Sequence, residues 1–517
     1  MIIIRNIILE SDNEEKLRDK ISKLIRNKDF DYEIYRKSID ARRGIKFNYQ
    51  VLVDIDPSDK ELKKIKNADR FKFRNQKIVI NNPPEEVAIV GSGPAGLFTA
   101  YILAQNGVKV KVYERGEAIE DRMTTIEAFE QGAPLNPESN IQFGEGGAGT
   151  YSDGKLTARS KDPRVRIVLE TFYKHGAPSD ILIDQKPHIG TDLLREVIVS
   201  MREEITALGG EFYFSHHLDD IEIIDGTINS IKINGDDYKS EAYVLAIGHS
   251  ARDTFEMLRD KIPMENKNFA VGFRIEHKRL TINNAQYNGH KTDMDGNTLP
   301  AASYNLSYND KENGLSAYTF CMCPGGYVVN ASSEEGQICV NGMSYHDRDN
   351  ENSNSALIVT IGEETYGDKL LDGMRFQREI EHRAYQLGEG KVPVQRYGDY
   401  KDNVATTSLG DIKPSVKGGY KLSNLRGIYP DDFEKIIIDS VEYMGKRIAG
   451  FNNPDAILSG VEARSSSPIR MIRDNTNRVE GIENLYVIGE GSGHAGGIVS
   501  SAVDGIKTAA EILARKI

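Results

Sequence analysis

The sequence predicts an α/β protein in which a three-layer α/β domain is discontinuous, an α+β domain is inserted into it, and a small α+β unit precedes it. Two observations carry this prediction. A short apolar run, a Gly-rich turn and a helical segment follow one another at residues 87–107, and the same order recurs at residues 484–513. Each set is typical of a strand and a helix of a parallel sheet. Two half-motifs at opposite ends of the chain indicate one domain that another domain interrupts.

Size and composition agree with a globular protein of several domains. The 517 residues allow two or three domains at roughly 150 residues each. No apolar run approaches the roughly 20 residues that span a bilayer, and only three apolar residues follow Met1, too few for a secretory signal. The three cysteines suit a reducing compartment. We therefore expect a cytoplasmic protein without a membrane partner.

Residues 1–82 are expected to form the small α+β unit. The patterns predict strands at Ile2–Leu9, 47–55 and 77–80, a helix at Glu14–Ile25 and a short helix at 58–65. Residues 1–80 hold 20 Lys and Arg against 14 Asp and Glu, whereas the whole chain has a net charge of -12. Such asymmetry occurs on nucleic-acid-binding surfaces, but the interspersed acidic residues favour a solvated basic face. We do not expect a nucleic-acid partner.

The segment 87–114 has the spacing of a dinucleotide-binding βαβ unit. After the strand at 87–90, Gly91 permits a tight turn, Gly93 lets the backbone approach a pyrophosphate, and Gly96 lets the helix pack closely on the strand. The N-terminus of this helix presents free N–H groups to the phosphates. Glu114 ends the second strand, where a carboxylate accepts hydrogen bonds from ribose hydroxyls and repels a 2′-phosphate. This favours FAD or NAD over NADP.

The C-terminal motif favours FAD over NAD. A strand at 484–488 leads into a run of glycines with Glu490, and a helix is expected at Ile498–Leu513. The pattern resembles the second FAD motif of flavoproteins, in which an acidic residue binds the ribityl chain. The following helix N-terminus points at the flavin pyrimidine and stabilises its anionic reduced form. We expect FAD to be bound non-covalently.

Two further segments are expected at the cofactor. Short strands across 211–243, with turns at Asp225-Gly226 and Asn234-Gly235, lead into a strand that ends near Gly248. The stretch 144–152 is too rich in glycine for regular structure, and its backbone N–H groups could bond the flavin. The residues expected to bind the cofactor are Gly91, Gly93, Pro94, Ala95, Gly96, Glu114, Arg115, Gly146, Gly147, Ala148, Gly149, Thr150, Gly248, Gly489, Glu490, Gly491, Gly496, Gly497 and Ile498.

The expected domains are residues 1–82, an FAD-binding domain at 83–260 and 456–517, and an inserted substrate domain at 261–455. No second complete dinucleotide fingerprint occurs between 155 and 480. A separate NAD(P)H domain is therefore not expected, and NADH or NADPH would act only as a transient reductant in the substrate cleft.

Segments spread along nearly the whole chain resemble a bacterial family of FAD-dependent or NAD(FAD)-utilising dehydrogenases that carry an N-terminal extension. They include GSGPAGL at 91–97, FGEGGAGTYSDGKL at 143–156, PHIGTDLL at 187–194, AIGHSARDTF at 246–255, FAVGFRIEH at 269–277, FCMCPGGYVV at 320–329, VEARSSSPIR at 461–470 and GEGSGHAGGI at 489–498. The resemblance implies a glutathione-reductase-like FAD fold and oxidoreductase activity. The expected pattern has Tyr where this chain has His494, which would titrate near neutrality if it approached the flavin.

The candidate catalytic residues are Arg252, Cys321, Cys323, Arg464 and His494. In a strand, Cys321 and Cys323 would share one face and could pass electrons as a dithiol, or they are two small buried residues. A metal site with Cys339 and His346 lacks a recognised ligand spacing, so no metal is expected. Arg252, Glu462 and Arg464 could lie in the active-site cleft, where Arg464 would hold an anionic substrate, or they form domain-interface salt bridges. His188, His249 and His277 are proton-transfer candidates or structural histidines.

These features predict an FAD-dependent dehydrogenase or reductase that transfers hydride between flavin N5 and a small organic molecule. An FAD-dependent monooxygenase is one alternative, since its fold can look the same. A non-catalytic flavin sensor or a nucleic-acid-associated flavoprotein, docked through residues 1–82, is another. The sequence leaves the substrate and the oligomeric state open.

Overall fold

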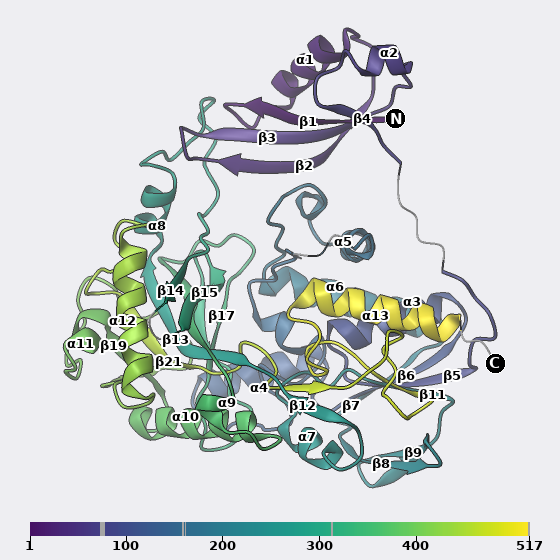
Figure 1. The fold of residues 1–517 in the computed structure, drawn as a ribbon, viewed down its shortest axis with the longest axis vertical. Coiled ribbons are helices and arrows are strands. Elements are labelled where there is room, and N and C mark those ends of the chain that lie inside the picture. Colours follow the sequence, from purple (N-terminus) through teal and green to yellow (C-terminus); the bar gives the residue numbers. More distant parts are fainter. Residues whose placement is uncertain (73–77, 158–159, 161, 312–313, 515–517) are drawn as a thin grey trace.

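The computed structural model describes residues 1–72, 78–157, 160, 162–311 and 314–514 (Figure 1). Three parts are visible: an N-terminal sheet, a parallel sheet flanked by helices, and a second large sheet with its own helices. Across these residues, no helix combines the length and apolar character that a membrane span requires.

The parallel sheet confirms the predicted three-layer architecture. Its order is β23-β11-β5-β6-β7, from Leu485–Val487, Ala242–Leu245, Glu86–Val90, Lys109–Glu114 and Glu211–Phe214. Because side chains alternate along a strand, Val87 and Ile89 face the helices α3 (Pro94–Gln105), α6 (Thr191–Ala207) and α13 (Ile498–Leu513). Ala88 and Val90 face the antiparallel strands β8 (Leu218–Ile224), β9 (Thr227–Ile233) and β10 (Asp236–Tyr238).

Helices α3 and α13 join the two ends of this domain. They pack so closely that a Cβ on Gly505 would lie 2.2 Å from the carbonyl oxygen of Ala95. Thr99 Oγ1 donates to that same carbonyl at 2.8 Å and to the Gly505 carbonyl at 3.3 Å. Figure 1 shows α13 beside α3 on one face of the sheet. This contact fixes the position of the C-terminal Gly-rich turn relative to the first one.

The second large sheet has seven strands in the order β14-β15-β18-β13-β21-β19-β20. The strands are Ser307–Asp310, Leu315–Cys323, Asn352–Ile361, Phe269–Lys278, Ile457–Glu462, Val392–Arg396 and Tyr420–Leu422. Helices α10 (Asp372–Gly388) and α12 (Asp431–Gly445) pack on it. The expected domain boundary at 455 would separate β21 from this sheet, although β21 pairs with β13. We therefore propose that the inserted domain extends through Glu462.

Shorter elements connect these layers. The strands β12 (Met264–Asn266) and β22 (Ile469–Met471) pair between the two large sheets, and β16 (Tyr327–Asn330) pairs with β17 (Val340–Met343). The remaining elements are α4 (Ile119–Glu130), η1 (Gly147–Tyr151), α5 (Arg164–Lys174), η2 (Ser179–Leu182), α7 (Arg252–Leu258), α8 (Arg279–Gln286), α9 (Glu363–Tyr366) and α11 (Tyr397–Lys401).

The N-terminal unit is a four-stranded sheet, β2-β3-β1-β4, with α1 packed on it. The strand β1 (Ile2–Leu9) and the helix α1 (Glu14–Ile25) have the predicted bounds, β3 is Lys46–Val53, and α2 is Asp59–Leu62. The strand predicted at 77–80 is wrong for residues 78–80, which have no regular structure, while Lys77 lies outside the described residues. The fourth strand is instead β4 (Ala68–Arg70), which pairs with β1, and β2 (Tyr32–Asp40) was not predicted.

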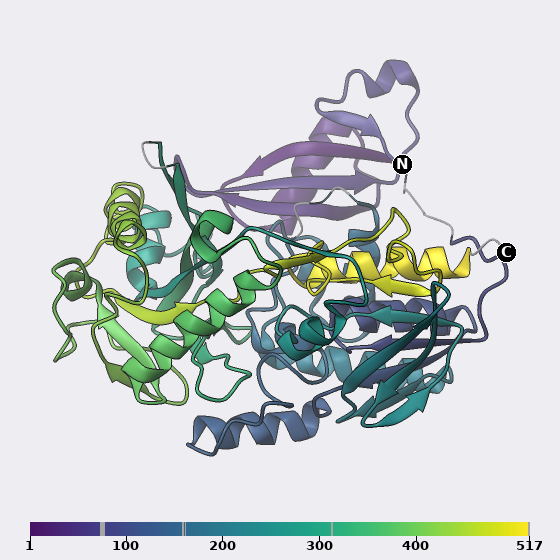
Figure 2. The same cartoon turned by 60° about the horizontal axis from the view of Figure 1, so that its bottom comes forward.

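The N-terminal sheet docks on both other parts of the molecule (Figure 2). On one side the backbone N–H of Lys37 donates to the Ile183 carbonyl at 2.7 Å, and that of Gln185 donates to the Lys37 carbonyl at 2.8 Å. On the other side Asp12 N donates to Asp293 Oδ2 at 2.9 Å, and Lys16 forms an ion pair with Asp295 at 2.5 Å. Several basic residues of this unit are thus paired within the chain.

Candidate functional site

A cavity of about 430 Å³ lies where the carboxyl ends of β5, β6 and β11 meet the inserted domain. Ligands of open α/β sheets bind at this edge of the strands. Both Gly-rich turns line it, and the opposite wall comes from the ends of β15, β17 and β21, with Cys321, Gly342 and Glu462. Two distant motifs and the inserted domain therefore share one site.

The glycines of this cavity leave room for a ligand. A Cβ on Gly93 would meet no protein atom nearer than 3.9 Å, and Gly248, Gly496 and Gly497 have nothing within 4 Å, although all four line the cavity. The helices α3 and α13 begin beside them without a side-chain cap at Gly93 or Gly497. Free N–H groups and the positive ends of two helix dipoles thus face the same space, which suits an anionic dinucleotide.

Glu114 organises the side of the cavity at the end of β6. Its buried carboxylate accepts hydrogen bonds from Ser92 N at 2.9 Å and Ser92 Oγ at 2.8 Å, and from the N–H groups of Gly116 and Gly144, both at 3.0 Å. Arg115 also lines the cavity, and its guanidinium is paired with Glu138 and Asp253. The carboxylate therefore holds both Gly-rich segments around the space where a ribose would lie.

The stretch 144–152, predicted to lack regular structure, contains the 3₁₀ helix η1 at Gly147–Tyr151, so that prediction is wrong. Buried Arg122 explains the order, because it donates to the Glu145 carbonyl at 2.7 Å, the Gly147 carbonyl at 3.1 Å and Thr150 Oγ1 at 2.8 Å. Sequence reasoning missed Arg122, since a single Arg in a helix carries no local signal of such a role.

The C-terminal turn is held by Asp504, a second residue that sequence reasoning missed. Its carboxylate accepts from Gly489 N at 2.9 Å and from Arg473 at 2.8 and 2.9 Å. An acidic residue among the small and apolar residues in the first half of helix α13 was the available signal. Glu490 lines the cavity, and its Oε2 lies at hydrogen-bond distance, 3.1 Å, from His249 Nδ1.

Most of the predicted cofactor residues line the cavity. Among the described residues, the lining does not include Gly96, Gly146, Thr150 or Gly491. Protein atoms surround three of them: a Cβ would lie 1.9 Å from Gly91 O at Gly96, 2.4 Å from Thr150 Cγ2 at Gly146, and 2.7 Å from Gly248 O at Gly491. Their role in cofactor binding stays a prediction, and their position indicates that they shape the turns.

Cys321 and Cys323 do not share one face of β15, contrary to the prediction. The strand is irregular between Phe320 and Cys323, and Cys321 has a φ of 40°. Cys323 is buried, whereas Cys321 is exposed to the cavity that both residues line. Burial raises the pKa of the Cys323 thiol, which weakens the hypothesis of a redox dithiol.

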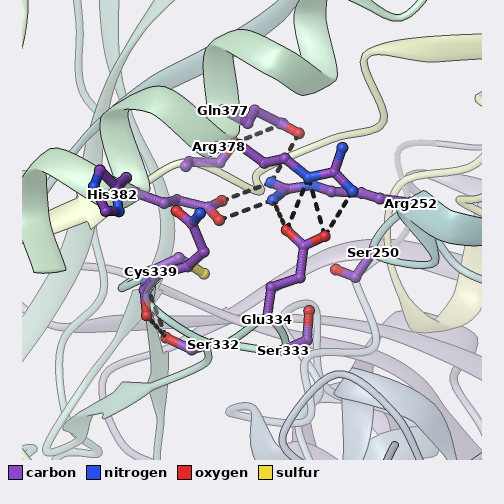
Figure 3. Close-up of polar contacts among 12 residues, drawn as sticks. Ser250, Arg252, Ser332, Ser333, Glu334, Cys339, Gln377, Arg378 and His382 are labelled. Atoms are coloured by element: carbon purple, nitrogen blue, oxygen red, sulfur yellow. Dashed lines mark hydrogen bonds and ion pairs between the residues drawn. The ribbon is translucent and has the colours of Figure 1, made fainter. Parts of the chain in front are cut away.

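Arg252 and Arg464 converge on one buried carboxylate. Glu381 accepts from Arg252 at 2.7 and 3.0 Å and from Arg464 at 2.9 and 2.8 Å. Arg252 also bonds Glu334 at 2.6 Å, and Figure 3 shows Glu334 between Arg252 and Arg378. Burial opposes ionisation of Glu381, but the two guanidinium groups lower its pKa to about 2. Arg464 lines the cavity, whereas the described lining lacks Arg252.

Three of the histidine candidates, His188, His277 and His494, contact backbone carbonyls. His188 Nε2 lies 3.0 Å from the carbonyl of His346, and His277 Nε2 lies 2.6 Å from that of Phe451. Burial lowers the pKa of each to about 4. His494 Nε2 lies 3.0 Å from the Met471 carbonyl, outside the cavity lining as far as the chain is described. The described residues also contain no group of three or more His, Cys, Asp or Glu that could hold a metal ion.

Glu462 is the buried acid at the cavity wall. Its Oε2 lies 3.5 Å from Arg274 Nε, an ion pair without hydrogen-bond geometry, and that oxygen has no hydrogen-bond partner. Burial raises the pKa of Glu462, and Arg274 opposes the shift. A buried carboxylate with a free acceptor is suited to a ligand or a proton.

Sequence comparison gives the family. Residues 268–465 match the model of the FAD-dependent protein, C-terminal domain-like; residues 89–143 match the NAD(P)-binding Rossmann-like domain; and residues 1–54 match a domain of unknown function. The chain is 44% identical over 528 residues to an uncharacterized protein of Clostridium beijerinckii, covering 99% of this chain and 98% of that protein. The chain belongs to this family of FAD-dependent proteins.

Solved structures show only distant likeness to this FAD-dependent protein. L-proline dehydrogenase from P. horikoshii is 13% identical, with 83% of this chain and 93% of that chain covered and a TM-score of 0.35. E. coli quinol fumarate reductase is 11% identical, with 83% and 70% covered and a TM-score of 0.38.

The predicted family, fold class and cofactor are confirmed. The protein is an FAD-dependent oxidoreductase, as the family match indicates. The open glycines and the two uncapped helix N-termini fit FAD, because they offer backbone donors and space in place of side chains.

Gly93→Ala is expected to weaken FAD binding about tenfold or more, because the new methyl group enters the space for the pyrophosphate and removes charge-assisted hydrogen bonds. The apoprotein should keep its melting temperature, since no protein atom lies nearer than 3.9 Å to the new Cβ. Equilibrium titration of the apoprotein with FAD measures the loss. Unchanged affinity would place the pyrophosphate elsewhere.

Glu381→Gln is expected to lower the free energy of unfolding at pH 7 by about 3–5 kcal/mol, because two buried guanidinium groups lose their counter-ion. The carboxylate contributes this stability above the pKa of an unfolded Glu, about 4.3, and loses it as the pH falls toward the folded pKa of about 2. The difference between wild type and variant should therefore shrink below about pH 4. Denaturant unfolding from pH 7 to pH 2 measures it.

The matched control is Glu379→Gln on the same helix. Glu379 pairs with Arg383 at 2.5 Å, but its side chain is 58% exposed. Its removal should change the free energy of unfolding by less than about 1 kcal/mol. An equal decrease in the free energy of unfolding in both variants would contradict a special contribution of buried Glu381 to stability.

Proposed function

We propose that this oxidoreductase is a dehydrogenase or reductase that transfers hydride between flavin N5 and a small organic molecule bound in the described cavity. Bound FAD would supply a two-electron acceptor or donor. The observation that carries the proposal is Glu462, a buried carboxylate that lines the cavity and does not use all of its hydrogen-bonding capacity within the chain. Oxidation of a C–H bond beside an O–H or N–H group releases a proton as well as hydride, and this carboxylate is placed to accept the proton.

The surroundings of Glu462 suit a proton acceptor. Burial raises its proton affinity, while Arg274 Nε at 3.5 Å keeps the ionised form accessible. The carboxylate is 4% exposed, so bulk water does not compete freely for it. In the reverse direction the Glu462 carboxylate would return the proton to the product.

The N-terminus of α13 supports the flavin side of the reaction. Gly497 and Ile498 line the cavity, and the helix has no side-chain cap at Gly497. Its free N–H groups and dipole favour negative charge on a ligand beside them. Ile498 adds an apolar surface at the same point, which limits the water that reaches the reacting atoms.

Anaerobic stopped-flow reduction of the holoenzyme tests the proposal. The visible flavin absorbance should bleach with NADH, with NADPH or with an oxidisable metabolite from a screen, and the electrons should then pass to an organic acceptor. A hydroxylated product formed with stoichiometric oxygen consumption would make the protein a monooxygenase instead. Failure of all reductants at full FAD occupancy would favour a non-catalytic flavoprotein.

Glu462→Gln is expected to slow the rate of flavin reduction by about 10²–10⁴-fold, the range for loss of a general base. In the wild type this rate should fall as the pH drops below the raised pKa of Glu462, because the protonated acid accepts no proton. The variant should lose that pH dependence. Rapid-mixing measurements across the pH range give both readouts.

Glu276→Gln is the matched control for Glu462→Gln. Glu276 is fully buried, has an oxygen without a hydrogen-bond partner, and has a pKa raised to about 7 by burial. The described cavity lining does not include it. This variant should alter stability and leave the reduction rate near that of the wild type. Equal slowing in both variants would contradict the role of Glu462 as the proton acceptor.

A further inference from the structure

At the inserted-domain end of the cavity, positively charged side chains outnumber the carboxylates that pair with them. Lys155, Lys186 and Arg348 line this end together with the carboxylates of Asp153 and Glu462, and Glu462 has its own cation in Arg274. Asp153 is buried and pairs with Arg348 at 2.5 and 2.9 Å and with Lys155 at 3.2 Å. Burial opposes its ionisation, but these cations lower its pKa to about 2. One negative charge is thus shared between two cations.

Lys186 adds a third positive charge. Its Nζ donates to Ser303 Oγ at 3.0 Å, and the described part of the chain provides it with no ion pair. Desolvation lowers the pKa of Lys186, and Arg348 and Lys155 lower it further. The chain places these cations near one another, because Lys155 pairs with His188, two residues after Lys186. Neighbouring cations create a positive potential at the end of the Lys186 side chain.

The backbone on both sides of Lys186 is held in place. Gln185 N donates to the Lys37 carbonyl of the N-terminal sheet at 2.8 Å, and Leu156 N donates to the Pro187 carbonyl at 2.9 Å. Its partner Ser303 is also held, because Gln286 Nε2 donates to the Ser303 carbonyl at 2.8 Å. The backbone that carries Lys186 therefore has a defined position, and its side chain is exposed.

The positive charges of the other two arginines that line the cavity are already paired with carboxylates. Arg115 pairs with Glu138 and Asp253, and Arg464 pairs with Glu381. Several lining residues beside Lys186 are exposed, among them Thr157, Asn305 and Cys321, so this end is open to solvent. A positive potential at an open cavity end attracts anions from solution.

We propose that the substrate of this enzyme is an organic carboxylate, whose charged group binds between Lys186 and Arg348 while its oxidisable carbon faces the flavin. This inference rests on the proposed function, in that the same cavity holds FAD and substrate. The ammonium group of Lys186 and Nη1 of Arg348 supply charge-assisted hydrogen bonds to the substrate carboxylate, because Asp153 binds only Nε and Nη2 of Arg348. The sequence had suggested Arg464 for this role, but all three of its nitrogens donate to Glu381 or Ser333.

The test uses oxidised holoenzyme and two probes of similar shape, benzoate and benzamide, each titrated while the flavin absorbance spectrum is followed. Benzoate should perturb the spectrum with saturation, and its affinity should fall as salt concentration rises. Benzamide should bind at least about tenfold more weakly, because it lacks the charge. Equal affinities, or no benzoate binding at low salt, would overturn the proposal.

Variants locate the site. Lys186→Gln should weaken benzoate binding about tenfold or more and leave benzamide binding unchanged, and Lys186→Arg should restore most of the affinity. The exposed Lys232 lies in β9, outside the described lining, so Lys232→Gln is the charge-matched control and should bind benzoate like the wild type. Full benzoate affinity in Lys186→Gln, with wild-type melting temperature and FAD content, would overturn the assignment.

These outcomes are separate from those of the proposed function. Benzoate binding is measured in the oxidised enzyme and needs no electron transfer. Failure of every reductant, with benzoate binding intact, would count against the dehydrogenase and not against the anion site. Reduction by uncharged substrates alone, without benzoate binding, would count against the anion site and not against the dehydrogenase.

Discussion

The close packing of α3 on α13 is the constraint on which the rest of the structure depends. The two helices come from segments about 400 residues apart, and a methyl group at Gly505 would collide with the Ala95 carbonyl at 2.2 Å. Because each helix begins at a Gly-rich turn, bringing the helices together also brings both uncapped N-termini to one cavity. A cofactor with a pyrophosphate and a redox ring can then contact both helix ends at once.

The inserted domain completes this cavity through charged groups that are buried and paired. Glu381 on α10 joins Arg252, at the start of α7, to Arg464, just beyond β21. A carboxylate shared by two guanidinium groups is favourable only when all three are held in good geometry. Glu381 and the two arginines therefore fix the wall that carries Glu462. Because both guanidinium groups already donate to Glu381, they have few N–H groups left to bind a substrate.

The N-terminal sheet has a structural connection to the site. Its strand β2 pairs through Lys37 with the segment 183–185, directly before Lys186, and its Asp12–Lys16 region contacts the loop at 293–295. The sequence predicted that the excess of basic residues in this unit forms a solvated face and not a nucleic-acid-binding surface. Several of those residues instead pair with acidic residues of the same chain, as Lys16 does with Asp295 and Lys37 with Asp184.

The sequence by itself determined the three-layer fold and the cofactor class, because both follow from local spacing. The order strand, Gly91, Gly93, Gly96, helix and Glu114 allows few structures, and periodicity predicted α1 and α13 to the residue. Only the tertiary structure decided the chemistry of the opposite wall. The pairs Arg252–Glu381, Arg464–Glu381 and Asp153–Arg348 join residues that are 83 to 195 positions apart. A bulge separates the faces of Cys321 and Cys323, and Arg122 orders a glycine-rich turn. Whether a charged side chain is free or compensated depends on such distant neighbours and on burial, which spacing along the chain does not encode.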